Sequence, residues 1–86
     1  MTPRAKEEEF RTLLEPHRRA IVAHCYRMLG SLADAEELAQ ESLLRAWQKR
    51  GDRTSTGSTR AWLNQIATRA CLDVLNNAAA TLEIEA

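Results

Sequence analysis

The chain has few of the residues that punctuate or cross-link a fold. Three of its 86 residues are glycine, two are proline, two are cysteine, and aromatic residues make up 5%. Scarce glycine and proline, with both tryptophans in helix-like stretches, favour an all-helical domain. Two cysteines, Cys25 and Cys71, cannot build a disulfide framework. No apolar run approaches the ~20 residues of a membrane span and no signal peptide opens the chain, so we expect a cytoplasmic protein.

The residues that are present describe one small globular domain. Hydrophobic residues make up 44% and charged residues 28% of the chain, an ordinary balance for a soluble fold. A chain of this length has room for one core and buries roughly 60% of its unfolded surface.

Charge is balanced in total but segregated along the chain. Twelve basic residues face twelve acidic ones. Residues 34–48 nevertheless carry a net charge of −3, and residues 49–72 carry +4. An acidic helix followed by a basic segment suggests two surfaces for two partners. The alternative is that solvated helix faces happen to segregate by sign.

Helical periodicity and end signals predict three main helices in a compact all-α bundle. The first covers about residues 4–29, is kinked or broken at Pro16, and ends at Gly30. The second begins at Ser31 or Asp34, which can cap its first turn, and ends by Gly51. Its predicted buried stripe consists of Ala35, Leu38, Ala39, Leu43, Ala46 and Trp47.

A polar loop at residues 51–58 leads into the third helix, which Ser58 or Thr59 caps. Apolar residues then repeat over four turns: Trp62, Leu63, Ile66, Ala67, Ala70, Cys71, Val74 and Leu75. Polar residues lie opposite: Arg60, Asn64, Gln65, Thr68, Arg69 and Asn76. The weakly patterned residues 77–86 form a tail.

No pattern supports catalysis. His17 and His24 flank Cys25, but no motif organises a nucleophile and a base. Both cysteines lie on apolar helix faces, so we expect buried core residues. Paired zinc ligands and a phosphate-binding glycine loop are absent from the sequence. We therefore expect a binding module that is not an enzyme and has no metal and no cofactor.

Three segments in order carry a family resemblance. Residues 34–47, DAEELAQESLLRAW, resemble region 2.2 of bacterial extracytoplasmic-function (ECF) sigma factors. Residues 58–73, STRAWLNQIATRACLD, resemble regions 2.3 and 2.4, and residues 23–30, AHCYRMLG, resemble region 2.1. The resemblance assigns residues 1–77 to a sigma-70 region 2 domain. Within it, region 2.1 spans about 10–30, region 2.2 spans 34–48, and regions 2.3 and 2.4 span 58–77. Residues 78–86 are a tail or the start of a linker, and region 4, which reads the −35 element, is absent from the sequence.

The resemblance implies two binding surfaces. In region 2.2 an acidic residue and a Gln-Glu pair bind the clamp helices of the largest catalytic subunit of core RNA polymerase. The matching residues are Glu37, Gln40 and Glu41, with Asp34 on the same face. Region 2.4 reads the upstream edge of the promoter −10 element. The matching residues are Gln65, Thr68 and Arg69, with Arg60 and Asn64 nearby.

The loop before region 2.4 accepts a flipped base of the non-template strand in this family. Its residues here are Arg53, Thr54, Ser55, Thr56, Gly57 and Ser58. The sequence departs from housekeeping members, which carry adjacent tryptophans at the melting junction, because Ala61 precedes a lone Trp62. Since Trp62 falls on the apolar stripe, we interpret it first as a core residue.

The implied function is promoter −10 recognition and melting within RNA polymerase holoenzyme. One alternative stays open, which is a helical scaffold that docks on polymerase or on an anti-sigma factor and binds no DNA. DNA cross-linking in the presence of core enzyme would separate the two.

Overall fold

The computed structural model describes the backbone of residues 3–52 and 57–85 and the side chains of residues 8–51 and 57–78. Every regular element in this part of the chain is helical, which confirms the predicted all-α class. The α-helices are α1 (Pro3–Leu13), α2 (Arg18–Leu29), α3 (Leu32–Gln48) and α4 (Thr59–Glu85), and two single turns of 3-10 helix are η1 (Glu15–His17) and η2 (Arg50–Asp52).

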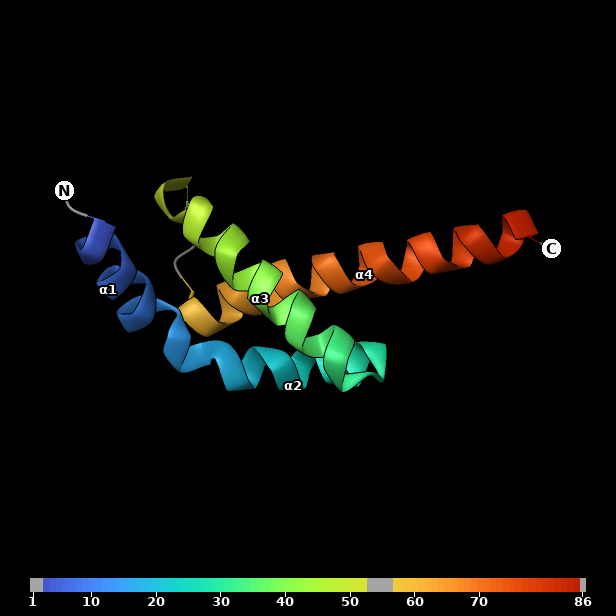
Figure 1. The fold of residues 1–86 in the computed structure, drawn as a ribbon, viewed down its shortest axis with the longest axis horizontal. Coiled ribbons are helices and arrows are strands. Elements are labelled where there is room, and N and C mark those ends of the chain that lie inside the picture. Colours follow the sequence, from blue (N-terminus) through green and yellow to red (C-terminus); the bar gives the residue numbers. More distant parts are fainter. Residues whose placement is uncertain (1–2, 53–56, 86) are drawn as a thin grey trace.

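The first predicted helix is broken at Pro16, as expected. Pro16 lies in η1, and the chain changes direction there between α1 and α2 (Figure 1). Proline lacks the N–H that a continuous helix would need. Arg18 donates from Nη2 and Nε to the Glu15 carboxylate at 2.6 and 2.8 Å. This ion pair ties the 3-10 turn to the first turn of α2.

The tight turn between α2 and α3 confirms both predicted end signals. Gly30 has a φ of 73°, the left-handed conformation that glycine adopts without a steric penalty, and its N–H donates to Tyr26 O at 2.8 Å. Ser31 Oγ then accepts from the Asp34 N–H at 3.3 Å, so Ser31 is the N-cap of α3. The turn makes α2 and α3 an antiparallel pair.

The core lies where α3 crosses α2 and α4 (Figure 1). Its residues are almost wholly inaccessible to solvent: Leu14, Ile21, Cys25, Ala35, Leu38, Ala39, Leu43, Ala46, Leu63, Ala67, Ala70 and Cys71. Five of these residues, all on α3 and α4, are alanines, whose small side chains allow close packing of helices. The buried polar residue Ser42 is satisfied because its Oγ donates to Leu38 O at 2.6 Å.

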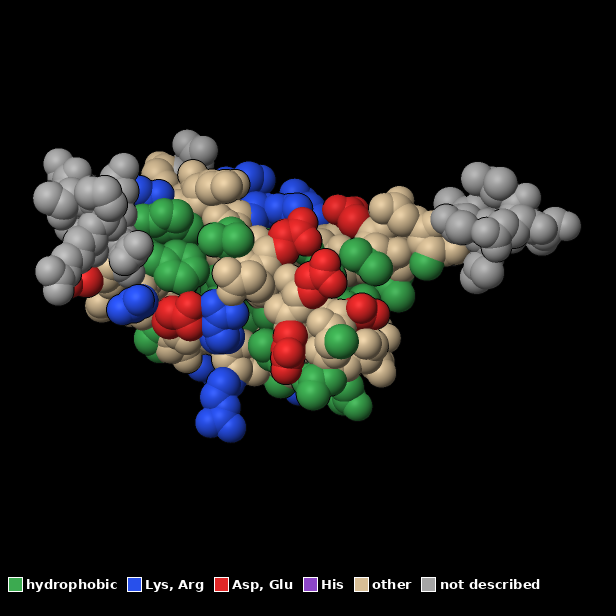
Figure 2. Space-filling view, in the orientation of Figure 1, with side chains coloured by type: hydrophobic (Ala, Val, Ile, Leu, Met, Phe, Trp, Pro, Cys, Tyr) green, Lys and Arg blue, Asp and Glu red, His purple; other side chains and the backbone are tan. Residues whose placement is uncertain are grey.

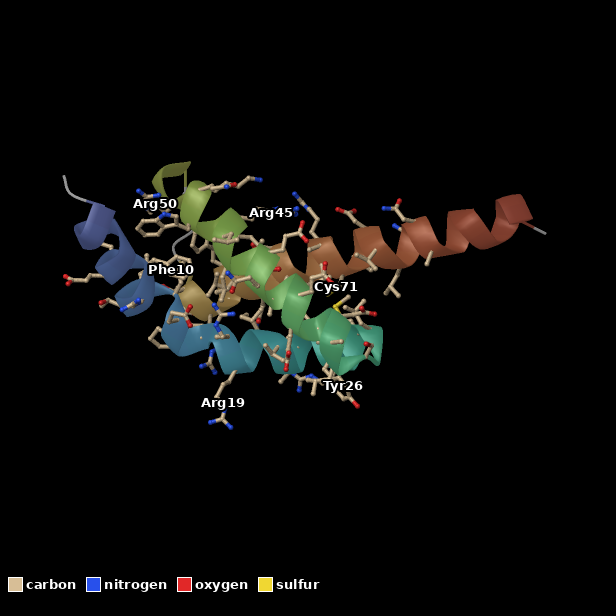
Figure 3. The ribbon with its side chains drawn as sticks, viewed as in Figure 1. Phe10, Arg19, Tyr26, Arg45, Arg50 and Cys71 are labelled. Carbon is tan, nitrogen blue, oxygen red and sulfur yellow. The ribbon has the colours of Figure 1, made fainter. Side chains whose placement is uncertain are left out.

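Helix α1 joins the body through stacked side chains at the C-terminal end of α3. The Phe10 and Trp47 rings meet edge to face with centroids 5.8 Å apart. The Arg50 guanidinium lies 3.6 Å from the Trp47 ring centroid, and its Nη1 donates to Trp47 O at 2.6 Å. Phe10 and Arg50 accordingly lie at the same end of the molecule (Figure 3).

Helix α4 is longer than the sequence pattern predicted. It continues through residues 78–85, which we expected to be a tail, because Ala78, Ala79 and Ala80 are strong helix formers and no glycine or proline stops the helix. Its C-terminal half projects beyond α2 and α3, which makes the molecule 52 Å long but only 26 by 23 Å across. Val74 and Leu75, predicted to be buried, are therefore 39% and 40% exposed. In the described part of the chain no helix combines the length and the apolar character needed to span a bilayer.

Candidate functional site

The acidic residues predicted to bind polymerase lie together on the outer face of α3. Asp34, Glu37, Gln40 and Glu41 are all exposed. Their spacing places them within about 120° of one another around the helix. Figure 2 shows acidic side chains gathered along the N-terminal part of α3, with basic ones beside its C-terminal end. The structure thus brings this predicted set onto one accessible surface.

The same face carries an apolar side chain that the sequence analysis did not single out. Leu44 is 45% exposed and lies one turn after Gln40 and two turns after Glu37. An exposed leucine among carboxylates offers a partner both apolar and charged contacts. The signal that could have found it is its spacing of four residues from Gln40 and seven from Glu37, which places it on the same face of the helix.

One ion pair links this acidic face to the next surface. Arg45 Nη2 donates to Glu41 Oε1 at 3.0 Å, one turn apart on α3. Both side chains keep access to solvent, so the pair contributes little to stability and can be exchanged for a partner's charge.

The second surface is a cationic groove between the C-terminal end of α3 and the helix α4. Its volume is about 250 Å³, and its lining residues are Arg45, Lys49, Trp62, Gln65, Ile66 and Arg69. Arg45 extends from α3 beside α4 (Figure 3). Gln65 and Arg69 were predicted from the sequence, whereas Arg45 and Lys49, which come from the C-terminal end of α3, were not. Their spacing of four residues at the basic end of α3 is the signal that was available.

The polar residues predicted on α4 separate into two groups. Asn64, Gln65, Thr68 and Arg69 line a shallow depression of about 430 Å³ together with Leu72. Arg60 is exposed and lies one turn before Asn64, about 40° away around the helix, but it is not part of this lining. The depression therefore brings together four of the five predicted DNA-binding residues, and Arg60 lies next to it along α4.

Thr68 differs from the prediction in one respect. It was expected on the exposed side, but it is half-buried at the edge of α4 that faces α2. A hydrogen bond of 2.7 Å joins its Oγ1 to His24 Nε2 on α2. The difference arises because two helices pack on α4, which narrows its exposed face.

The structure describes only part of the predicted base-capture loop. Arg53, Thr54, Ser55 and Thr56 lie outside the described residues. Gly57 and Ser58 are exposed, and Ser58 Oγ accepts from the Ala61 N–H at 3.1 Å. Ser58 therefore caps α4, as one of the two predicted alternatives.

The two cysteines are core residues, as predicted. Both are fully buried, on α2 and α4. Burial, and then the hydrogen bond with the Cys71 thiol, raise the pKa of Cys25 to about 12. A thiol with so high a pKa is a poor nucleophile. Within the described residues no three His, Cys, Asp or Glu side chains gather into a potential metal site, and the absence of a bound metal stays a prediction.

Trp62 packs against the core while bordering the cationic groove. Its interpretation as a core residue is therefore confirmed, although part of its ring remains accessible.

The chain, whose helical fold carries an acidic face and a cationic groove, was compared with models of known protein families. The family model for sigma-70 region 2 matches residues 13–81. The chain belongs to this family, whose members are not enzymes.

Individual relatives are ECF RNA polymerase sigma factors. The chain is 52% identical over 67 residues to SigG of Mycobacterium tuberculosis, a match that covers 78% of this chain and 18% of SigG. It is 31% identical over 67 residues to SigW of Bacillus subtilis, covering 78% of this chain and 36% of SigW. SigJ of Mycobacterium tuberculosis is 38% identical over 65 residues, a match that covers 76% of this chain and 20% of SigJ. The chain thus spans between 18% and 36% of the length of these relatives. No solved structure matches it.

Proposed function

We propose that this chain is region 2 of an ECF sigma factor, which binds core RNA polymerase, recognises the promoter −10 element and helps to melt it. The observation that carries this proposal is that two surfaces of opposite charge lie next to each other. The exposed acidic face of α3 suits a basic protein partner, and the groove lined by Arg45, Lys49 and Arg69 suits phosphates.

The α3 face docks on the clamp helices of the largest polymerase subunit. Glu37, Gln40 and Glu41 supply charged and amide contacts, and Asp34 extends the face toward the start of α3. Leu44 supplies an apolar contact at the C-terminal end of this face. Interfaces of this type gain specificity from charge complementarity and affinity from a few desolvated side chains.

The α4 surface contacts the upstream edge of the −10 element. Arg69 and Gln65 can reach base edges, since guanidinium and amide groups form paired hydrogen bonds with purines. Arg45 and Lys49 neutralise phosphates beside them. Arg60, one turn before Asn64 on α4, contacts backbone phosphate outside this groove.

Residues 53–58 receive a flipped base of the non-template strand. Capture must offset the unstacking free energy, which is a few kcal/mol, so DNA whose base is already unpaired binds more tightly. The complex operates in the cytoplasm, where it finds polymerase and DNA. An anti-sigma factor that occupies the acidic face is a further partner of the same chemistry as polymerase.

Fluorescence anisotropy with −10 oligonucleotides tests the proposal. Single-stranded non-template, duplex and scrambled oligonucleotides are titrated with the chain, with and without core polymerase. We expect a preference for single-stranded promoter sequence and an affinity that falls as salt rises. Equal affinity for scrambled and promoter sequences in both settings would reject DNA reading. Binding to core enzyme alone would then favour the scaffold that docks on polymerase without reading DNA.

A further inference from the structure

Thr68 differs from its neighbours on α4 because another helix holds its side chain. His24 Nε2 on α2 and Thr68 Oγ1 on α4 are 2.7 Å apart, although the residues are separated by 44 positions in the sequence. Both side chains are half-buried, whereas Gln65 and Arg69 are exposed. The contact therefore connects the interior of the α2–α4 pair with the surface that Gln65 and Arg69 share.

The hydrogen bond restricts what the Thr68 hydroxyl can do. A threonine hydroxyl has one donor and two acceptor positions, and the contact with His24 uses one of them. Because Oγ1 is attached to Cβ, one torsion angle sets its position, and in a helix threonine otherwise divides between two rotamers. His24 thus fixes the rotamer and leaves the remaining hydrogen-bonding positions of Oγ1 for another partner.

Thr68 is placed where such a partner would bind. It lines the 430 Å³ depression with Asn64, Gln65, Arg69 and Leu72. His24 is not among the described residues that line this depression. The hydrogen bond with Thr68 is the contact through which His24 can act on a ligand bound there.

We propose that His24 is a positioning residue for −10 recognition, which orients the Thr68 hydroxyl toward one DNA base. This inference rests on the proposed function and adds a residue of region 2.1 to the reading of DNA. Losing one neutral hydrogen bond weakens an interaction roughly three- to tenfold. The effect should fall on discrimination at the base that Thr68 contacts and should leave the other bases unchanged.

A double-mutant cycle tests the proposal. The variants are His24→Leu, Thr68→Val and the double variant, measured as complexes with core polymerase on −10 oligonucleotides in which each base is changed in turn. We expect both single variants to lose discrimination at the same base position, roughly three- to tenfold. The double variant should lose no more than Thr68→Val alone, because the two residues act as one unit.

Conservative variants separate positioning from packing. His24→Gln can place an amide near the position of Nε2 and should retain discrimination, whereas the shorter His24→Asn should lose it. His17→Leu is the matched control, since His17 lies in η1 and its Nδ1 has no hydrogen-bond partner among the described residues. If circular dichroism shows that His24→Leu does not fold, base discrimination is compared between the His24→Gln and His24→Asn variants.

The outcomes distinguish this inference from the proposed function. A uniform loss of affinity at every base position, or additive effects in the cycle, would show a merely structural role and overturn the positioning of Thr68. Unchanged discrimination in His24→Asn would also overturn it. If the wild-type complex itself prefers no base, the proposed DNA reading fails, and the positioning role fails with it.

Discussion

The acidic face of α3 and the proposed DNA-reading face of α4 are built in different ways. The α3 face belongs to one helix, and its four predicted residues are all exposed. The α4 face depends on three helices, because Arg45 and Lys49 reach it from α3 and His24 holds Thr68 from α2. A surface on one helix follows from helical periodicity, whereas a surface between helices depends on packing. The Glu41–Arg45 ion pair is where the two surfaces meet.

Removing the shared core should abolish both surfaces at once. Leu63 is fully buried between α4 and the other helices, so Leu63→Ala should lower the free energy of unfolding by about 2–5 kcal/mol. Urea denaturation followed by circular dichroism measures this loss. Leu44→Ala, at an exposed leucine, is the control and should change stability by under ~0.5 kcal/mol. Equal losses in the two variants would contradict the described core.

Reversing charge on α3 should separate the two surfaces. Glu37→Lys with Glu41→Lys should weaken binding to core polymerase by about 2–5 kcal/mol if the partner's charges are buried and left unpaired. The fold should persist, because both residues are exposed. Competition for labelled core enzyme measures the affinity. Glu36→Lys changes an exposed acid outside the predicted contact set and serves as the matched control. Unchanged binding with an intact circular dichroism spectrum would contradict the assignment of this face.

Substitutions in the surface around α4 should weaken DNA binding and leave binding to core polymerase unchanged. Arg69→Ala or Gln65→Ala should weaken upstream −10 recognition by ~1–3 kcal/mol if the contact to a base is bidentate, with core binding unchanged. Lys49→Ala should instead weaken binding to all DNA sequences alike, because the predicted contact of Lys49 is a phosphate. It should also make the DNA affinity depend less on salt concentration. Anisotropy at several salt concentrations separates the two behaviours. A sequence-specific effect of Lys49→Ala would reverse these roles.

The smallest expected effect lies away from both surfaces, at the break between α1 and α2. The hydrogen bond from Arg18 holds the pKa of Glu15 below its ordinary value of 4.5. A carboxyl group whose pKa is lowered by folding stabilises the protein at pH values above its ordinary pKa. This contribution disappears as the pH falls through the folded-state pKa. The stability difference between wild type and Glu15→Gln should therefore be small at pH 7 and vanish in acid. Thermal unfolding at pH 7 and below pH 4 measures it, and a difference that grows in acid would have the wrong sign.

Much of the fold could be predicted from local chemistry. Proline at position 16 breaks a helix because it lacks an N–H, Gly30 ends α2 because it can adopt a positive φ, and Ser31 starts α3 because its hydroxyl caps the first turn. The shared face of Asp34, Glu37 and Glu41 followed from their spacing, and the family resemblance added Gln40. Two predictions failed where local chemistry did not decide. Residues 77–86 were predicted to be a tail from their weak patterning, and the burial of Val74 and Leu75 was predicted from periodicity.

The sequence by itself determined the helical class, the end of α2, the start of α3, the buried cysteines and the accessible acids, because each depends on residues within a few turns of one another. Only the tertiary structure decided where α4 leaves the body, which places Val74 and Leu75 in solvent. It also decided that Arg45 and Lys49 share a groove with Arg69, and that Thr68 faces His24 rather than open solvent. Periodicity gives the direction of a side chain around its own helix, but the partner that it meets depends on how the helices cross.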